Sequence, residues 1–113
     1  MTARYALLYI CTAMRYDVFD VLSDPTRRRI LEALRGRERA VNDIVERMDI
    51  DQSGVSRHLR ILKNAGFVTT RPSGAQRLYS LRREPFVELE GWLSRYRVQV
   101  MDRRQVRRRE RAG

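Results

Sequence analysis

Hydrophobic residues recur at helical spacing in the middle of this chain, between residues 51 and 66. They form one stripe at i, i+4 and i+7, made of Val55, Leu59 and Leu62. The positions between them are polar or basic, so the pattern predicts a short helix with one apolar and one cationic face. Asp51 can cap the start of this helix, and Gly66 can end it in a left-handed conformation.

The segments on either side of residues 51–66 complete a larger unit. Residues 42–48 form a second short helix by the same periodicity, with a tight turn at 49–50 before Asp51. After the central helix, residues 67–71 and 76–81 read as two strands joined by a turn at 72–75 that contains proline and glycine. A helix-turn-helix followed by a hairpin predicts a winged helix, mainly α with a small β-hairpin.

The remaining segments extend this unit at both ends. Ser23-Asp24-Pro25 predicts a helix start, with a helix to about residue 35, and residues 37–40 form a loop that could lend a short strand to the wing. Residues 2–22 predict one or two helices with Tyr5 and Tyr9 on one face. The last helix follows Pro85 and carries a periodic apolar stripe: Phe86, Leu89, Trp92, Leu93, Tyr96 and Val100.

We expect one domain over residues 1–101 and a basic C-terminal tail over 102–113. A large apolar stripe is rarely left in water, so we expect the N-terminal and the last helices to form a dimer interface. The alternative is packing of the last helix on its own subunit. Met14 is also a credible start codon, so the first thirteen residues need not belong to the natural product. The expected interface residues are Tyr5, Tyr9, Leu89, Trp92 and Tyr96.

Charge points to the partner of this domain. The chain has 24 lysines and arginines against 14 acidic residues, a net charge of +10. Such an excess favours a polyanion, and double-stranded DNA before a membrane, because the helices carry no broad apolar face of the kind that lies on a membrane. The apolar run at 5–14 is too short to span a bilayer. One cysteine, Cys11, and one histidine, His58, give no basis for catalysis, and a single cysteine fits a reduced cytoplasm.

The cationic face of the central helix supplies the candidate DNA contacts. Residues near the start of a recognition helix meet base edges, and those further along or on the hairpin meet phosphate. The expected base readers are Gln52, Ser53, Ser56 and Arg57; the expected backbone contacts are Arg60, Lys63, Arg71 and Arg77. Arg77 could instead pair with an acid. The cluster Arg27–Arg29 is expected to be a mostly solvated face, of which one member could touch phosphate. His58 is expected to be a hydrogen-bonded, partly buried imidazole.

Two motifs resemble the arsenic-repressor (ArsR) family of bacterial winged-helix regulators. They are LSDPTRRRIL at 22–31 and VSRHLRILKNAGFV at 55–68, and Tyr79-Ser80-Leu81 belongs with them. The resemblance covers roughly residues 18–101, and the last helix is similar to the metal-free branch. It implies a homodimer that binds a palindromic operator and represses its own transcription unit. The family's metal sensors carry a Cys-x-Cys box where this chain has Ala40 and Asn42, so we expect no metal site and no cofactor.

We therefore expect a sequence-specific transcriptional regulator of the bacterial cytoplasm and nucleoid, most simply a homodimeric autorepressor with an unidentified inducer. The alternative is an architectural or protein-interaction winged helix that binds nucleic acid by charge alone or not at all. Gln52, Ser56 and Arg57 distinguish these hypotheses, because binding by charge alone does not need amide and hydroxyl groups on the groove face.

Overall fold

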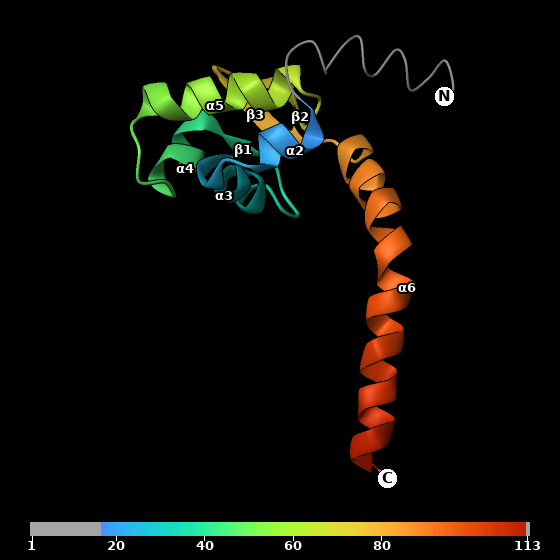
Figure 1. Ribbon diagram of the computed structural model, residues 1–113. Helices are drawn as coiled ribbons and strands as arrows, with labels where there is room; N and C mark the ends of the chain where they lie inside the picture. Colours follow the sequence, from blue (N-terminus) through green and yellow to red (C-terminus); the bar gives the residue numbers. More distant parts are fainter. Residues whose placement is uncertain (1–16, 113) are drawn as a thin grey trace, which may run out of the picture.

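The computed structural model describes residues 17–112 and shows a winged helix-turn-helix body from which one long helix extends (Figure 1). The predicted fold class, mainly α with a small β-hairpin, is confirmed. The elements, in chain order, are α2 (Val18–Leu22), α3 (Pro25–Ala33), β1 (Arg39–Ala40), α4 (Val41–Glu46), α5 (Gln52–Asn64), β2 (Val68–Ser73), β3 (Gln76–Leu81) and α6 (Glu84–Ala112).

Aspartate side chains fix where α3 and α5 begin. Asp24 accepts from the backbone N–H groups of Thr26 and Arg27, at 2.8 and 3.2 Å, and Pro25 occupies the first helical position of α3. Asp51 accepts from the N–H of Gly54 at 2.9 Å and starts α5 as predicted. Each cap satisfies donors that have no partner inside the helix, so the starting residue of each helix is specified locally.

The core forms where α3, α4 and α5 meet the base of the hairpin. The predicted stripe of α5 is buried to 1% exposure or less at Val55, Leu59 and Leu62. The other elements contribute further buried residues: Val21, Ile30, Leu31, Leu34, Ile44, Phe67 and Val68. Because the apolar stripe of α5 belongs to this single buried cluster, the polar face of the helix points to solvent.

The sheet has the order β1-β3-β2, with antiparallel pairing throughout. The predicted short strand in the loop at 37–40 is confirmed as β1. The hairpin turn is shorter than predicted, because β2 continues through Pro72 and Ser73 and only Gly74 and Ala75 connect the strands. Proline is tolerated here because β2 is an edge strand, and Gly74 takes a positive φ of 62° in the two-residue connection.

Two helix boundaries also differ from the predictions. The helix α4 ends at Glu46 rather than at residue 48, and α3 ends at Ala33 rather than near residue 35. In both cases the apolar periodicity continues past the last helical residue. Leu34 and Met48 pack on the core from turn positions, so apolar spacing overestimates helix length where a core residue lies in the turn.

The helix α6 runs from Glu84 to Ala112 and projects away from the body (Figure 1). Its first turn is anchored by Phe86, whose ring meets Phe67 edge-on with centroids 5.6 Å apart. It continues without a break through the expected boundary at residue 101, so the division into a domain and a tail stays a prediction. No helix among the described residues is long and apolar enough to cross a bilayer.

Candidate nucleic-acid interface

The helix α5 presents its polar face to solvent. Gln52, Ser53, Arg57 and Arg60 are exposed, and Ser56 is half-buried beside the core stripe. Over residues 17–112, the side chains of Gln52, Ser56 and Arg57 have no hydrogen-bond partner, so their donors are available to a ligand. Ser53 differs from them because its hydroxyl donates to the Asp51 carboxylate at 3.0 Å. Ser53 therefore also supports the helix cap.

The tight turn before α5 explains a glycine at an unusual place, the first turn of a helix. A Cβ at Gly54 would lie 3.0 Å from Ile50 Cδ1 and 3.2 Å from Asp51 Oδ1. Hydrogen bonds from the Gly54 N–H and the Ser53 hydroxyl lower the pKa of the Asp51 carboxyl. The glycine therefore lets the cap and the turn close tightly, and it orients the start of α5 relative to α4.

Of the arginines of α3, Arg28 and Arg29 are exposed, as the sequence predicts for a mostly solvated face, whereas Arg27 is not. Arg27 is nearly buried and donates from Nε to the Val21 carbonyl at 2.9 Å and from a terminal nitrogen to the Asp20 carbonyl at 3.1 Å. Arg28 donates to the Leu22 carbonyl. These carbonyls lie in the last turn of α2, and the Asp20 carbonyl also accepts from the backbone N–H and the hydroxyl of Ser23. The two arginines therefore add to the C-terminal cap of α2 and fasten this helix to α3.

Arg29, the third member of this cluster, has a different role. It forms an ion pair with Asp49 at 2.9 Å, in the turn between α4 and α5. Both side chains are at least half exposed, so the pair contributes little to stability. Its geometric effect is to connect α3 to the turn of the helix-turn-helix.

Arg39 stabilises the same unit from the other side, a role that no sequence pattern predicts. Its Nε donates to the Ala33 carbonyl at 2.6 Å, and a terminal nitrogen pairs with Asp43 at 2.7 Å. The hydrogen bond from Arg39 lowers the pKa of the Asp43 carboxyl. One nearly buried guanidinium thereby joins the end of α3, the strand β1 and the first turn of α4.

The two candidate arginines of the wing lie on opposite faces of the sheet. Arg71 pairs in register with Leu78, and Arg77 with Pro72, so their side chains alternate. Arg71 reaches Glu38 with two parallel hydrogen bonds, one of 2.9 Å from Nε to Oε2, and this contact lowers the pKa of Glu38. Arg77 donates to the Thr70 hydroxyl at 3.4 Å, and no acid pairs with it in the described part of the chain. The assignment of both to DNA backbone stays a prediction.

His58 is more enclosed than predicted. Its side chain lies on the apolar side of α5 and is 8% exposed, and its Nδ1 atom is buried without a hydrogen bond to any residue between 17 and 112. Burial lowers the pKa of the imidazole, and the nearby Asp24 carboxylate opposes this shift. The predicted hydrogen bond of a partly buried histidine is therefore absent from the part of the chain that the structure describes.

Aromatic side chains of α2 and α6 form a second exposed surface, here called the aromatic face. The ring of Trp92 lies edge-on to Phe19, with centroids 5.1 Å apart, and meets Tyr96 at 5.0 Å. All three remain 43–51% exposed, although they contact one another. Phe19 was not predicted in this surface, because its helix is too short for a periodic stripe. Leu89 is half-buried, and the predicted interface residues Tyr5 and Tyr9 lie outside the described residues.

Candidate metal ligands do not gather within residues 17–112, where no three histidine, cysteine or acidic side chains come together. Ala40 lies in β1 and Asn42 in the first turn of α4. Neither side chain is a soft-metal ligand, and the expectation of a protein without a metal cofactor stays open to experiment.

Comparisons with known proteins agree with this geometry. The family model described as "Bacterial regulatory protein, arsR family" matches residues 24–70. The transcriptional repressor SdpR of Bacillus subtilis is 36% identical over 77 residues, which cover 68% of this chain and 86% of SdpR. A crystal structure of a possible transcriptional regulator for arsenical resistance has 33% identity and a TM-score of 0.66, covering 77% of this chain and 91% of that one.

A further solved structure is the homodimeric winged helix-turn-helix DNA-binding domain Mb0332 from Mycobacterium bovis. It is 25% identical to this chain, with a TM-score of 0.63, and the match covers 91% of this chain and 93% of that one. This match extends over nearly the whole chain, so it includes regions beyond the helix-turn-helix.

Proposed function

Because the chain belongs to the ArsR family of bacterial regulatory proteins, we propose that it is a sequence-specific transcriptional repressor that binds an inverted-repeat operator as a homodimer. The observation that carries the proposal is the polar face of α5. The side chains of Gln52, Ser56 and Arg57 are free of partners among the described residues, and the Asp51 cap and the buried stripe fix the direction of this face.

The division of roles along α5 follows from where each residue lies. Gln52, Ser53, Ser56 and Arg57 are in the N-terminal half, from which a recognition helix reaches base edges in the major groove. Arg60 and Lys63 come one to two turns later and are assigned to phosphates. In the wing, Arg77 can reach the backbone directly, whereas Arg71 must first exchange the Glu38 carboxylate for a phosphate.

The aromatic face supports the homodimer. Phe19, Trp92 and Tyr96 leave a large apolar area in solvent, and surfaces of this kind usually mark an interface. A second copy of this chain is the occupant that an inverted repeat requires, because its two half-sites are related by a twofold axis. The homodimeric Mycobacterium bovis domain has the same fold.

The signal that releases the repressor is proposed not to be a soft metal. Zinc or arsenite needs several thiolates or imidazoles in one place, and the chain has only Cys11 and His58. Titration of DNA binding with these metals, with and without chelator, tests this statement. A metal-induced loss of binding that Cys11→Ser abolishes would make the N-terminal segment the sensor.

The test of the proposed function is a footprint on the DNA upstream of the protein's own gene, together with sedimentation of the complex. We expect protection of two half-sites whose centres lie about 34–36 Å apart, with two protein chains bound. Random duplex of the same length is the control. Equal affinity for both duplexes at every salt concentration would favour the architectural alternative, in which charge alone carries binding.

A further inference from the structure

The helix α6 changes its charge along its length. Residues 84–101 contain three acids and two arginines, whereas residues 102–112 contain six arginines with Asp102 and Glu110, and so a net charge of +4. The structure continues α6 as one helix through these last residues to Ala112. Residues 102–112, here called the basic end, therefore follow helical geometry, which decides on which side of the helix each arginine lies.

Five of the six arginines of the basic end share one side of the helix. At about 3.6 residues per turn, residues three and four apart come together around the axis. This spacing places five arginines within about 140° of one another and leaves Arg109 on the other side. Asp102 lies on the other side as well, and Glu110 lies at the edge. The five arginines, here called the arginine face, are Arg103, Arg104, Arg107, Arg108 and Arg111.

The arginine face suits a polyanion. Several of its members, such as Arg103 and Arg107, are like charges at i, i+4, and this spacing destabilises a helix unless an anion lies beside it. The face is about 12 Å long, from residue 103 to residue 111. Over that length a DNA duplex presents about seven phosphates, at one charge per roughly 1.7 Å of its axis.

The composition of the basic end favours phosphate over other anionic surfaces. Planar guanidinium groups match phosphate oxygens with two parallel hydrogen bonds. Val106 is the one large apolar residue in this segment. The basic end therefore lacks both the apolar and aromatic residues of a protein interface core and the apolar face of a helix that lies on a membrane.

The position of the basic end separates it from the recognition helix. The helix α6 has 29 residues and is about 43 Å long. Figure 1 shows α5 along one side of the body and the C-terminal end of α6 well beyond α3, on the opposite side, with no other described element beside it. The twofold axis of an inverted repeat is perpendicular to the duplex, so the second copy has its basic end on this side too.

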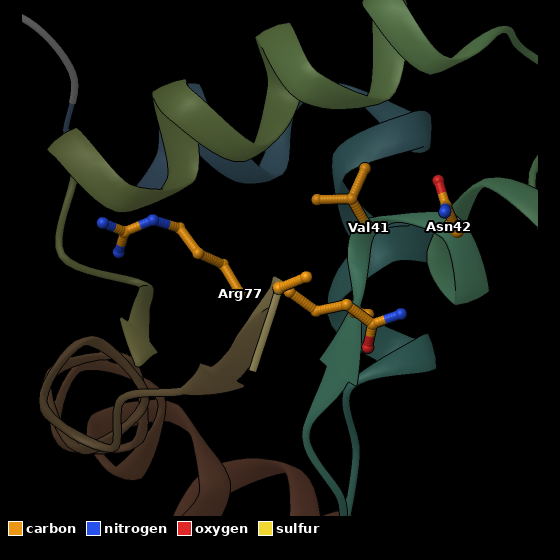
Figure 2. A pocket seen from close by; sticks show the side chains of 6 residues that line it. Val41, Asn42 and Arg77 are labelled. Atoms are coloured by element: carbon orange, nitrogen blue, oxygen red, sulfur yellow. The ribbon is translucent and has the colours of Figure 1, made fainter. Parts of the chain in front are cut away.

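The small hollow of the body is not a second site of this kind. It lies between the start of α4 and the tip of the wing, where Val41, Asn42 and Arg77 are among the residues that line it. Figure 2 shows the Arg77 side chain directed away from Asn42, and Arg77 donates to the Thr70 hydroxyl at 3.4 Å. No cation is therefore directed into the hollow from this side of the wing, in contrast to the five that share one side of α6.

We infer that the basic end of α6 binds the phosphates of a second DNA duplex, so that a dimer on its operator holds another stretch of DNA on its opposite side. This contact does not depend on base sequence, because it involves the backbone alone. The bridging of operator to other DNA rests on the proposed function, whereas phosphate binding by the arginine face does not.

Capture of a labelled random duplex by protein already bound to an immobilised operator tests the inference. We expect the wild type to retain the duplex, and this capture should weaken with salt with a log–log slope of up to about −4.5, at about 0.9 for each of five phosphates. A five-site variant, with every member of the arginine face changed to glutamine, should lose the capture. It should keep its helix, because glutamine is a good helix former, and also its dimer and its operator affinity. Circular dichroism and sedimentation measure the first two.

Two single substitutions distinguish the arginine face from charge alone. Arg107→Gln removes a member of the face, and Arg109→Gln removes the same charge two residues later on the other side of the helix. Arg107→Gln should lower the salt slope of capture by about one, and Arg109→Gln should leave it unchanged. Equal effects of the two substitutions would overturn the assignment to one face.

Three other results would overturn the inference. Capture that the five-site variant retains would exclude the arginine face as the site. Loss of operator affinity in that variant, without capture of a second duplex by the wild type, would place the basic end on the same duplex as α5. Retention of a labelled single-stranded RNA in place of the duplex would make the ligand RNA.

The proposed function fails separately, if the wild type does not prefer its operator to random duplex. Random duplex then replaces the operator on the support, and the same comparison of wild type and five-site variant still tests phosphate binding by the basic end.

Discussion

Replacing Trp92 with alanine tests whether the aromatic face is a dimer interface. Trp92 contacts Phe19 and Tyr96 in its own chain, and yet 43% of its surface stays exposed. If a second copy covers this remainder, the substitution removes buried area from the interface. If the tryptophan serves only its own chain, the substitution weakens folding and leaves association unchanged.

The size of the effect follows from the exposed area. A tryptophan can bury up to about 250 Å², so 43% exposure leaves on the order of 100 Å² for a partner to cover. At about 25 cal/mol per Å² this is worth about 2.5 kcal/mol, or about 5 kcal/mol for the two copies in a symmetric dimer. If the partner covers this area fully in the wild type, Trp92→Ala should raise the dimer dissociation constant by between three and four powers of ten, at about 1.4 kcal/mol for each factor of ten. If the partner covers it only in part, the increase should be smaller.

Sedimentation equilibrium over a wide concentration range measures this change directly. Val87→Ala is the control, because Val87 is 54% exposed on the same helix but lies five residues earlier, on a different side. Operator affinity should fall with dimerisation, since a tight complex needs both recognition helices. A folded Trp92→Ala protein with wild-type dimerisation and wild-type operator affinity would refute the interface.

Three further predictions concern single side chains. Arg57→Ala should weaken operator binding by about 1–3 kcal/mol and random-duplex binding by less; equal losses in filter binding would contradict a base contact. Arg71→Ala should weaken both duplexes equally and lower the salt slope by about one, and Glu38→Gln should steepen it by releasing Arg71; a slope that Glu38→Gln leaves unchanged would exclude the exchange. Burial lowers the pKa of His58 below its usual 6.5, so the unfolded chain takes up the proton first and the free energy of unfolding should decrease as the pH falls below about 6.5. Urea unfolding should show no such loss in that range for His58→Leu, and an unchanged pH profile would contradict the assignment.

The parts of the fold that could be predicted are those with local causes. Asp24 and Asp51 start α3 and α5 because a cap needs only the residues that follow it, and the stripe of Val55, Leu59 and Leu62 is buried because it alternates with polar residues. The sequence predicts a hairpin turn at residues 72–75, but Pro72 continues the strand β2. Whether a proline can continue a strand depends on which strand lies beside it, and that is a property of the sheet rather than of the segment.

The positions of the candidate readers on α5 followed from the sequence as well, whereas some close contacts elsewhere did not. Gly54 lacks a side chain because Ile50 and the Asp51 carboxylate occupy the space, a contact that needs the three-dimensional turn. Phe19 joins Trp92 across two helices separated by most of the chain. Neither pairing leaves a periodic signal in the sequence, because each depends on how distant or sharply turned segments meet.

Arginine shows most clearly why composition alone misjudges this surface. The net charge of +10 suggests a broad cationic face. However, Arg27 and Arg39 donate to backbone carbonyls and pair with nearby carboxylates within the body of the protein, and both side chains are nearly buried. A guanidinium held in this way cannot replace counterions on DNA. The salt dependence of binding should therefore reflect the exposed cations of α5 and of the wing rather than the total charge. The internal arginines contribute indirectly, because they hold α2, α3 and α4 in the arrangement that directs the polar face of α5 outward.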